Sequence, residues 1–296
     1  MSESGIIVVD KPGGMTSHDV VARIRRLAGT RRVGHAGTLD PMATGVLVVG
    51  VEKATRLLGY LTLTEKEYKA TIRLGQSTTT DDAEGEPNGG SPAVGVTRDA
   101  LDAEVAKLTG EIMQVPPGVS AIKIDGQRAY KLTRAGAAPE MKPRPVRVDE
   151  FRVANIRSVD EFLDLDAVIR CSSGTYIRAL ARDLGAGLGT GGHLTALRRT
   201  RVGPYGEARA ATLQDLSERI ELTPLAQAAA AAFPRIDLTE ADADRLSHGI
   251  RIGVPAGSPS GTAEAPAAAF APDGSLVALV TTESGRLRPL AVFASS

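Results

Sequence analysis

A single carboxylate, Asp40, lies in the middle of a glycine-rich stretch that runs from Gly34 to Gly45. Glycines allow positive φ and a close approach of a ligand to the backbone, and Pro41 disfavours the α region at the residue before it. A carboxylate fixed in this way suits a nucleophile or a general base. Aspartate and glycine are also ordinary turn residues, so the pattern by itself equally fits a tight turn with a solvated aspartate.

Motifs of several other catalytic classes do not occur in this sequence. The glycine-rich stretch lacks the Gly-Lys-Ser/Thr ending of a P-loop, and no G-x-G-x-x-G pattern opens a helix after a strand. There is no G-x-S-x-G motif, and the single cysteine, Cys171, has no evident activating partner. Chemistry on nucleoside triphosphates or dinucleotides is therefore not expected.

A second polar stretch, Cys171 to Arg178, carries a cation near the expected start of a helix. The helix macrodipole disfavours a cation there by roughly some tenths of a kcal/mol. An anionic partner, either a carboxylate or a phosphate, would explain Arg178, because a guanidinium fork holds a carboxylate ionised and oriented. The alternative is a surface arginine that tolerates the small penalty.

Basic residues are clustered although the chain has no net charge, with 35 Lys plus Arg and 35 Asp plus Glu. Zero net charge argues mildly against a nucleic-acid partner, whereas clustering favours one basic face and a polyanionic partner. The alternative is that each cluster is a solvated helix face. The clusters are Arg23, Arg25, Arg26, Arg31 and Arg32; Lys123, Arg128, Lys131, Arg134, Lys142, Arg144, Arg147 and Arg152; and Arg198, Arg199 and Arg201.

The overall composition is that of a soluble globular protein, with 42% hydrophobic and 24% charged residues in 296. The sequence has no basic leader with an apolar core and no run of about 18 apolar residues, so we expect a cytoplasmic protein. One cysteine excludes an internal disulfide, and the four histidines show no ligand spacing, so we expect no metal site.

The elements that must position these side chains follow from hydrophobic periodicity and from glycine and proline. Thr16 and Ser17 are expected to cap a helix that Gly29 ends. A second helix is expected to open at Thr175 and to be broken by glycines from Gly185 on. Strands are expected over 5–10, 46–50, 67–75, 146–157 and 161–171, helices over 99–109 and about 127–135, and a loop over 76–98.

The chain after residue 224 is expected to form an alanine-rich helix and linker, followed by a small β-rich module. This module should contain a low-complexity loop over 254–269 and hairpin turns at Asp273-Gly274 and Ser284-Gly285. Strands outnumber helices and show no regular β-helix-β alternation, so we predict the α+β class.

In their order along the chain, these residues resemble the bacterial tRNA pseudouridine-55 synthases, the B-type branch of the pseudouridine synthases. The resemblance runs from about residue 5 to 217. It is carried by the pattern Gly-His-x-Gly-x-Leu-Asp-Pro-x-Ala-x-Gly, by the Lys11-Pro12 strand end, by Tyr68, by the loop of residues 75–85 and by Ser173-Gly174-Thr175-Tyr176-Ile177-Arg178.

This resemblance implies a mixed, mainly antiparallel central sheet flanked by helices and loops. It also implies a catalytic domain over 1–230, with a basic, proline-rich RNA-binding insert at about 113–145, and a PUA-like RNA-binding domain over 231–296. The implied reaction breaks the C1′–N1 bond of the T-loop uridine of tRNA, rotates the base and rejoins it through C5. The enzyme is expected to act as a monomer on the T-arm, without cofactor or metal.

Asp40 matches the family's catalytic aspartate, and Arg178 matches the arginine that pairs with it and keeps it ionised. Whether Asp40 attacks C1′ or removes the 2′ proton stays open. Tyr68 matches a tyrosine that stacks on the target base, and its ordinary pKa near 10 makes it a poor base at neutral pH. The expected substrate-binding residues are His35, Asp82, Tyr176, Leu197 and Lys11.

The target uridine must be flipped out of the tRNA elbow, at a cost of about a few kcal/mol. Stacking and phosphate contacts would offset this cost. Three alternatives remain: a non-catalytic tRNA chaperone on the same fold, a glycosidase or base-excising glycosylase, and a guide-RNA-dependent relative. Glycosidases usually need paired acids, and the loop offers only Asp40. The compact N-terminus and the lack of basic tails favour an enzyme that works without a guide RNA.

Overall fold

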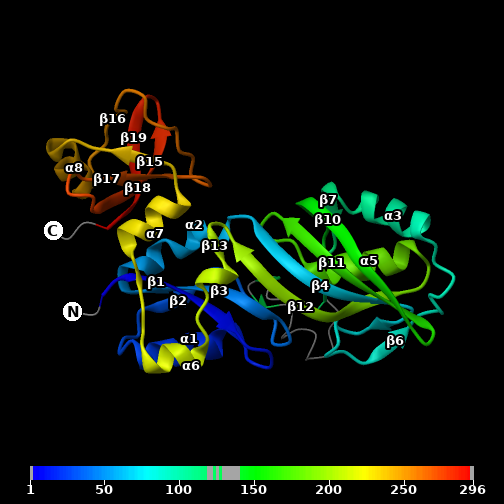
Figure 1. Cartoon of the computed structure of the whole chain (residues 1–296). Coiled ribbons are helices and arrows are strands. Elements are labelled where there is room, and N and C mark those ends of the chain that lie inside the picture. The colour runs from blue at the N-terminus through cyan, green and yellow to red at the C-terminus, as the bar shows by residue number, and fades with distance from the viewer. Residues whose placement is uncertain (1–2, 119–122, 125–126, 129–140, 294–296) are drawn as a thin grey trace. The chain divides into compact units, whose positions relative to one another are not determined.

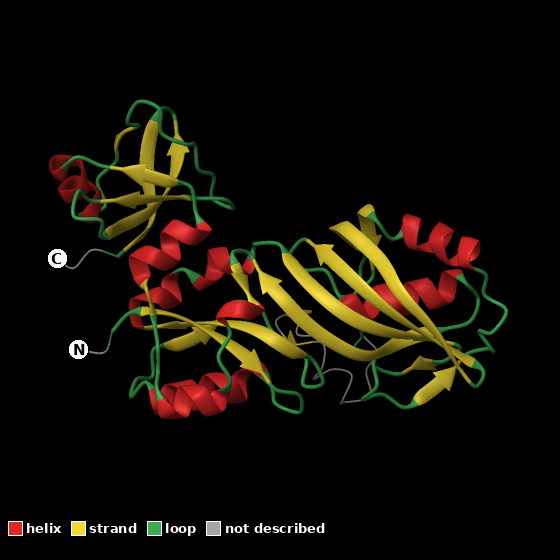
Figure 2. Cartoon of the chain, viewed as in Figure 1, coloured by secondary structure: helices red, strands yellow, loops and turns green. Residues whose placement is uncertain are grey.

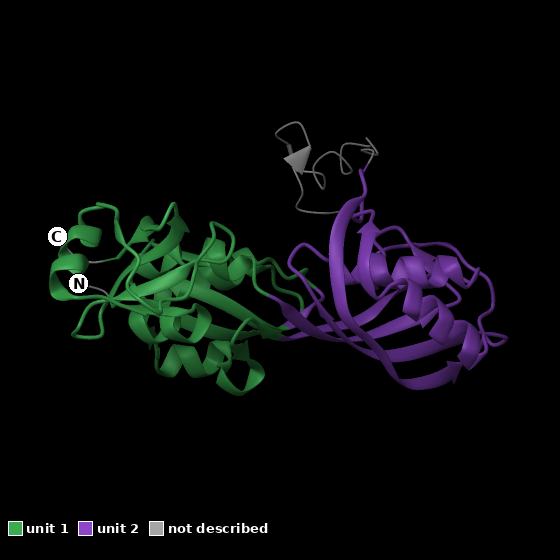
Figure 3. Ribbon diagram, turned by 90° about the horizontal axis from the view of Figure 1, so that it is seen from above, with its two compact units in different colours: residues 1–41, 45–64, 201–296 green, residues 42–44, 65–200 purple. Residues whose placement is uncertain are grey.

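The computed structural model describes residues 3–118, 123–124, 127–128 and 141–293. The chain divides into two compact units, which Figure 3 shows in different colours. Unit 1 comprises Met1–Pro41, Gly45–Thr64 and Arg201–Ser296, and unit 2 comprises Met42–Thr44 and Glu65–Thr200.

Unit 1 is built on the strand pair β1 (Gly5–Lys11) and β3 (Thr44–Val51), which run antiparallel in continuous register. β3 is buried along almost its whole length, as its unbroken apolar run predicts. Helices α1 and α6 cover one face of these strands, and α2 and α7 cover the other (Figure 1). The remaining elements of this part are β2 (Val33–His35), η1 (Glu52–Arg56), α2 (Leu58–Thr62), β13 (Tyr205–Gly206), η2 (Glu207–Arg209), α6 (Leu213–Glu218), β14 (Thr223–Pro224) and α7 (Leu225–Ala232).

Helix α1 (Ser17–Leu27) begins and ends as the sequence predicts. Thr16 is the N-cap and forms a capping box with Asp19, in which each side chain accepts the other residue's backbone N–H. The apolar positions at helical spacing, Val20 and Ile24 among them, are buried against the strands. Gly29, at φ +64°, takes the left-handed conformation that ends the helix.

The C-terminal part of unit 1 is a five-stranded sheet in the order β15-β17-β18-β19-β16. The two predicted turns are confirmed: Gly274 (φ +82°) lies between β17 and β18, and Ser284 and Gly285 (φ +50° and +70°) lie between β18 and β19. The elements are β15 (Arg235–Asp237), α8 (Glu240–Ser247), β16 (Ile252–Gly253), β17 (Ala267–Phe270), β18 (Leu276–Glu283) and β19 (Arg286–Val292).

Two features of this sheet differ from the prediction. Helix α8 was not expected, although Thr239 caps it through the Asp242 N–H. Residues 267–269, assigned to a low-complexity loop, belong to the fully buried strand β17. Alanines carry little strand propensity of their own, and only their position in the middle of the sheet makes them a strand.

The C-terminal sheet shares its core with the rest of unit 1. Phe270 and Leu279 of the sheet belong to the same cluster of buried apolar side chains as Ile6 of β1 and Ala228 of α7. Lys53 Nζ also donates to the Phe293 carbonyl at 3.0 Å. A second cluster, which includes Ile236 and Val277, is formed within the sheet and α8 alone.

Unit 2 is an antiparallel sheet in the order β12-β4-β11-β10-β7, with helices α3 and α5 packed against it (Figure 2). Burial alternates strictly along β4, as its pattern predicts. The elements are β4 (Lys66–Leu74), β5 (Ser77–Thr78), β6 (Pro87–Gly89), α3 (Arg98–Lys107), β7 (Gly110–Gln114), β8 (Lys123–Ile124), β9 (Gln127–Arg128), β10 (Arg144–Val159), β11 (Phe162–Cys171), α5 (Ile177–Gly187) and β12 (Gly192–Val202). The predicted α+β class is confirmed.

Three local expectations in unit 2 need correction. Helix α5 begins at Ile177 with Tyr176 as N-cap, and it continues through Gly185 instead of breaking there. A Cβ at Gly185 would lie 2.2 Å from the backbone of Gly191, so this glycine serves a close approach of the next turn. The expected loop over 76–98 contains the short β5–β6 hairpin. Where a helix was expected, Gln127–Arg128 pairs as a strand with β8, and residues 129–135 lie outside the described residues.

Candidate active site

The Asp40 loop, residues 36–43, connects the antiparallel strands β2 and β3. His35 pairs with Val49, and the Ala36 N–H donates to the Val48 carbonyl at 2.9 Å. Gly37 and Gly45, on either side of Asp40, take φ of +90° and +96°. These conformations let the chain bulge out between two paired strands, with Asp40 half-buried in the bulge.

Ser17, the first residue of α1, holds the residue before Asp40. Its Oγ accepts the Leu39 N–H at 2.8 Å and donates to the Leu39 carbonyl at 3.1 Å. Both residues are buried. The hydroxyl therefore satisfies both backbone groups of Leu39, which would otherwise be unpaired and costly in this environment.

The turn between β1 and α1 holds the residue after Asp40. The Pro41 carbonyl accepts the Gly14 N–H at 2.8 Å and Lys11 Nζ at 3.2 Å. Lys11 is fully buried, and its ammonium also donates to the carbonyls of Pro12 (2.8 Å) and Met15 (2.6 Å). Asp40 is thus held between two anchored neighbours. These contacts indicate that Lys11 supports the loop; its predicted contact with substrate stays a prediction.

His35 is half-buried at the start of this loop. Its ring meets that of His18 edge to face, with centroids 5.6 Å apart. His35, Lys11 and Asp40 all belong to unit 1. The other five predicted site residues belong to unit 2.

In unit 2, two arginines one turn apart on α5 hold an acidic loop. Arg178 is buried; its NH1 donates to the Thr80 carbonyl at 2.8 Å, and its Nε lies 3.5 Å from Asp82 Oδ2. Arg182 donates to Asp81 at 3.2 Å, and burial raises the pKa of Asp81 despite this cation. The anionic partner that a cation in the first turn of a helix requires is thus present.

Asp82 is buried and both of its carboxylate oxygens are used within the protein. Oδ1 accepts the Thr80 hydroxyl and the Glu84 N–H, the latter at 3.1 Å, while Oδ2 faces Arg178. This geometry fits a residue that fixes the guanidinium of Arg178. The predicted contact of Asp82 with the base stays a prediction.

Tyr176, the N-cap of α5, is fixed by a side chain from a distant strand. The buried amide of Gln114 donates from Nε2 to the Tyr176 carbonyl at 3.1 Å and accepts the Tyr176 N–H at Oε1 at 2.8 Å. This two-point contact sets the start of α5 and hence the direction of Arg178, two residues on.

A groove of about 580 Å³ runs over unit 2 and is lined by one of the remaining predicted residues. Leu197 lines it, as do Met42 and Thr44, two and four residues after Asp40 in the chain, and Ala83, next to Asp82. Tyr68 lies two residues before the lining residue Ala70, on the same face of β4. Lys69 and Arg198 add positive charge to the lining, and Asp166 adds a negative charge.

The Cys171 thiol is buried. Burial raises the pKa of the Cys171 thiol to about 12, so it is not a thiolate at neutral pH. Among the described residues no group of three or more His, Cys, Asp or Glu side chains could hold a metal ion. None of the described helices is long and apolar enough to cross a membrane.

Sequence reasoning missed Ser17 and Gln114 as residues of the site. Ser17 carried a signal only as part of a helix cap, and the contact to Leu39, 22 residues away, is not visible in sequence. Gln114 lies 62 residues before Tyr176 and belongs to no motif.

Comparison with known proteins shows the family to which the chain belongs. Family models match residues 25–177 (TruB family pseudouridylate synthase, N-terminal domain), 178–229 (tRNA pseudouridylate synthase B, C-terminal domain) and 233–294 (tRNA pseudouridine synthase II, C-terminal). The tRNA pseudouridine synthase B of Thermobifida fusca is 62% identical over 99% of both chains. That of Streptomyces griseus is 59% identical over 98% of this chain and 97% of the relative.

Solved structures give the same result. A chain in the crystal structure of a Cbf5-Nop10-Gar1 complex is 29% identical, with a TM-score of 0.74 over 98% of this chain and 84% of that chain. A chain in an H/ACA RNP bound to a substrate RNA is 28% identical, with the same score over 98% and 85%. The fold and site define a pseudouridine synthase, an isomerase of uridine in RNA. The chain belongs to the TruB family of these synthases.

Proposed function

We propose that this protein isomerises the T-loop uridine at position 55 of tRNA to pseudouridine, with Asp40 as the catalytic carboxylate. The observation that carries the proposal is the two-sided anchoring of Asp40, through Ser17 on Leu39 and through Lys11 and Gly14 on Pro41. A carboxylate that must meet one ribose carbon or one 2′ proton gains from such fixed geometry. The tRNA pseudouridine synthases B to which the chain is similar support the choice of substrate.

In this proposal Arg178 keeps Asp40 ionised and oriented, and Tyr68 stacks on the flipped base. His35, Tyr176 and Leu197 bind the flipped nucleotide and the RNA around it, while Asp82 and Lys11 support the site. Flipping the uridine costs about a few kcal/mol, which stacking and phosphate contacts offset.

We further propose that residues 1–230 form the catalytic domain, that the basic insert at about 113–145 contacts the T-arm, and that residues 231–296 form a PUA-like RNA-binding domain. The small β-rich sheet of residues 235–292 supports the last assignment. The enzyme is expected to act in the cytoplasm as a monomer, without cofactor or metal; sedimentation of the full chain tests its oligomeric state.

The experiment uses an unmodified tRNA transcript labelled with tritium at C5 of uridine. Isomerisation replaces the C5 hydrogen, so wild-type protein is expected to release tritium, and Asp40→Asn should reduce the release below detection while still binding tRNA. If the wild type releases no tritium, the synthase proposal is wrong. If Asp40→Asn keeps full activity, Asp40 is not the catalytic carboxylate. Free uracil among the products would indicate a glycosylase instead.

A guide-RNA-dependent enzyme is the second candidate, because two of the similar chains come from assemblies of several components, an H/ACA RNP bound to a substrate RNA and a Cbf5-Nop10-Gar1 complex. The same assay separates the two, since a plain tRNA transcript carries no guide. Release from the transcript with protein alone identifies an enzyme that needs no guide. Release only after addition of a guide RNA favours the second candidate.

A further inference from the structure

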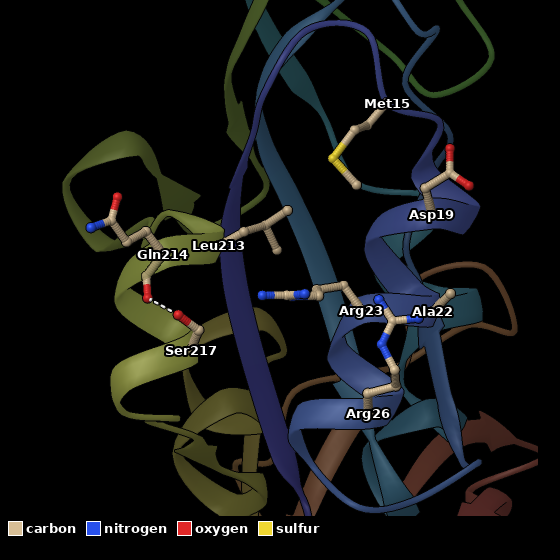
Figure 4. A pocket seen from close by; sticks show the side chains of 8 residues that line it. All are labelled: Met15, Asp19, Ala22, Arg23, Arg26, Leu213, Gln214 and Ser217. Carbon is tan, nitrogen blue, oxygen red and sulfur yellow. Dashed lines mark hydrogen bonds between the residues drawn. The ribbon is translucent and has the colours of Figure 1, made fainter.

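A groove between α1 and α6 in unit 1 shares with the site described above the residue Met15, whose carbonyl accepts Lys11 Nζ. It measures about 530 Å³ and is lined by Met15, Asp19, Ala22, Arg23, Arg26, Leu213, Gln214 and Ser217 (Figure 4). The arginines come from α1, and the neutral polar side chains come from α6 on the opposite wall.

Its two guanidinium groups lie on the same face of α1, three residues apart. Figure 4 shows the side chain of Arg23 pointing toward Leu213 on α6, while that of Arg26 extends along the surface of α1. Both are exposed, and neither makes a hydrogen bond or ion pair within the described part of the chain. Neighbouring arginines differ: Arg25 donates to the Val33 carbonyl at 3.1 Å, and Arg32 lies 3.6 Å from Glu52.

Asp19 is the single carboxylate in the lining; it stays ionised, and Figure 4 shows it pointing away from both arginines. Asp19 Oδ2 accepts the Thr16 N–H and hydroxyl at 2.9 and 2.7 Å in the capping box, and these hydrogen bonds lower the pKa of Asp19. The groove therefore presents two cations without a carboxylate directed at them. On the opposite wall, Figure 4 shows the Gln214 side chain pointing away from the arginines, and the Ser217 hydroxyl donates to the Gln214 carbonyl at 2.7 Å.

We propose that this groove binds the sugar-phosphate backbone of the RNA substrate, at a place separate from the pocket for the flipped base. Phosphodiester oxygens accept hydrogen bonds and carry the charge that guanidinium groups bind in two-point fashion. The apolar floor of Met15, Ala22 and Leu213 suits the carbon face of a ribose. That the ligand is the tRNA substrate rests on the proposed function. That the ligand is negatively charged rests on the groove alone.

The test measures binding of the full chain to an unmodified tRNA transcript at several salt concentrations. The variant Arg23→Gln/Arg26→Gln should raise Kd about tenfold or more and reduce the slope of log K against log salt by about 2, because two phosphate contacts no longer release counterions. In the tritium assay its KM should rise more than its kcat falls. Arg23→Lys/Arg26→Lys keeps the charges and should keep most of the salt slope.

The matched control is Arg98→Gln/Arg219→Gln, which removes two exposed arginines that already pair with Asp102 and Glu221. If both double variants bind tRNA alike, the groove does not bind RNA, and an acidic protein segment becomes the occupant to seek. A fall in RNA affinity specific to Arg23 and Arg26, in a protein whose wild type releases no tritium, would support the groove while refuting the isomerase proposal.

Discussion

The backbone of Asp40 is positioned by side chains that do no chemistry themselves. Ser17 contacts Leu39, and Lys11 contacts Pro41, so the residues on both sides of the carboxylate are fixed while the carboxylate stays half-buried. The contacts come from the start of α1 and the end of β1. Small shifts of that turn are therefore expected to reach the reacting oxygen directly.

Ser17→Ala is expected to lower kcat about 100-fold, the scale that a displacement of about 1 Å can cost. It leaves two buried backbone groups of Leu39 unpaired, at about 1–3 kcal/mol each. Single-turnover rates at saturating tRNA measure the effect, and Ser17→Thr, which keeps the hydroxyl, should restore much of it.

Thr16→Ala is the matched control for this variant. It removes the N-cap of the same helix, at about 0.5–2 kcal/mol of stability, and leaves the contact to Leu39 in place. Turnover should stay near the wild-type value. Equal losses of kcat in both variants would show that Ser17 acts only through the stability of α1.

Arg178→Lys is expected to lower kcat about 100-fold and to change the Kd for tRNA by less than about threefold. A lysine ammonium cannot reach the Thr80 carbonyl and Asp82 with the geometry of a guanidinium. Arg182→Lys, one turn along α5 and more exposed, is the control and should affect kcat little. Parallel losses of kcat and binding would instead identify Arg178 as a phosphate anchor.

At the scale of elements, hydrophobic periodicity correctly predicted strands in which buried and more exposed residues alternate. Strand β4 was expected over 67–75 and spans Lys66–Leu74, because every second residue faces the core. The predicted end of α5 was wrong because a glycine such as Gly185 usually breaks a helix. Only the close approach of Gly191 shows why glycine is needed at this position inside the helix. β17 was missed for the same reason: its strand character comes from neighbours that are distant in sequence.

The candidate site was predictable to the extent that it lies in contiguous motifs. Asp40 and Arg178 each belong to such a motif, and these motifs, in their order along the chain, resemble those of one family. Gln114 and Ser17 could not be found, because each acts on a backbone amide far along the chain, and such contacts leave no spacing pattern.

The antiparallel strands β4, β11 and β10 carry a charge network that predicts how stability depends on pH. Hydrogen bonds from Arg157, and then from Asn155 and Thr71, lower the pKa of Asp166 to about 2 from an ordinary 3.8. As the pH falls, Asp166 is protonated in the unfolded chain before it is protonated in the folded protein. The stabilisation that ionised Asp166 gives to the folded state is therefore complete above pH 4 and is lost as the pH falls through 2.

Asp166→Asn should therefore lower the free energy of unfolding at pH 7 by about 1 kcal/mol, after allowance for solvent screening of a side chain that is 34% exposed. The difference from wild type should shrink as the pH falls from 4 toward 2, measured by urea unfolding. Asp237→Asn, at a carboxylate that is 72% exposed, serves as control. A difference that persists unchanged at pH 2 would contradict the assignment.

At the scale of the whole molecule, unit 1 joins the two ends of the chain in one apolar core. Phe270 in the C-terminal sheet and Ile6 in β1 belong to the same cluster. The C-terminal sheet is therefore expected to unfold together with β1 and α7, although the sequence predicts a separate domain. Deleting it would expose core as well as remove a candidate RNA-binding surface.

Phe270→Ala is expected to cost about 3–5 kcal/mol, from lost burial and the cavity left behind. Hydrogen exchange should speed up in β1 as well as in β18, because both contribute to the same core. Val277→Ala, in the cluster confined to the C-terminal part, should speed exchange in β18 and leave β1 nearly unchanged. Unchanged exchange in β1 after Phe270→Ala would show that the C-terminal sheet unfolds independently.

The buried thiol of Cys171 has a practical consequence for following this protein in solution. The chain has no other cysteine, and a thiol with its pKa raised to about 12 should not react with maleimides while the protein is folded. A cysteine introduced at an exposed position, such as Val94 in unit 2 or Ile250 in unit 1, would then take a fluorophore alone. Pairs of such labels would test by energy transfer whether the distance between the two units changes when tRNA is added, without first removing the native cysteine.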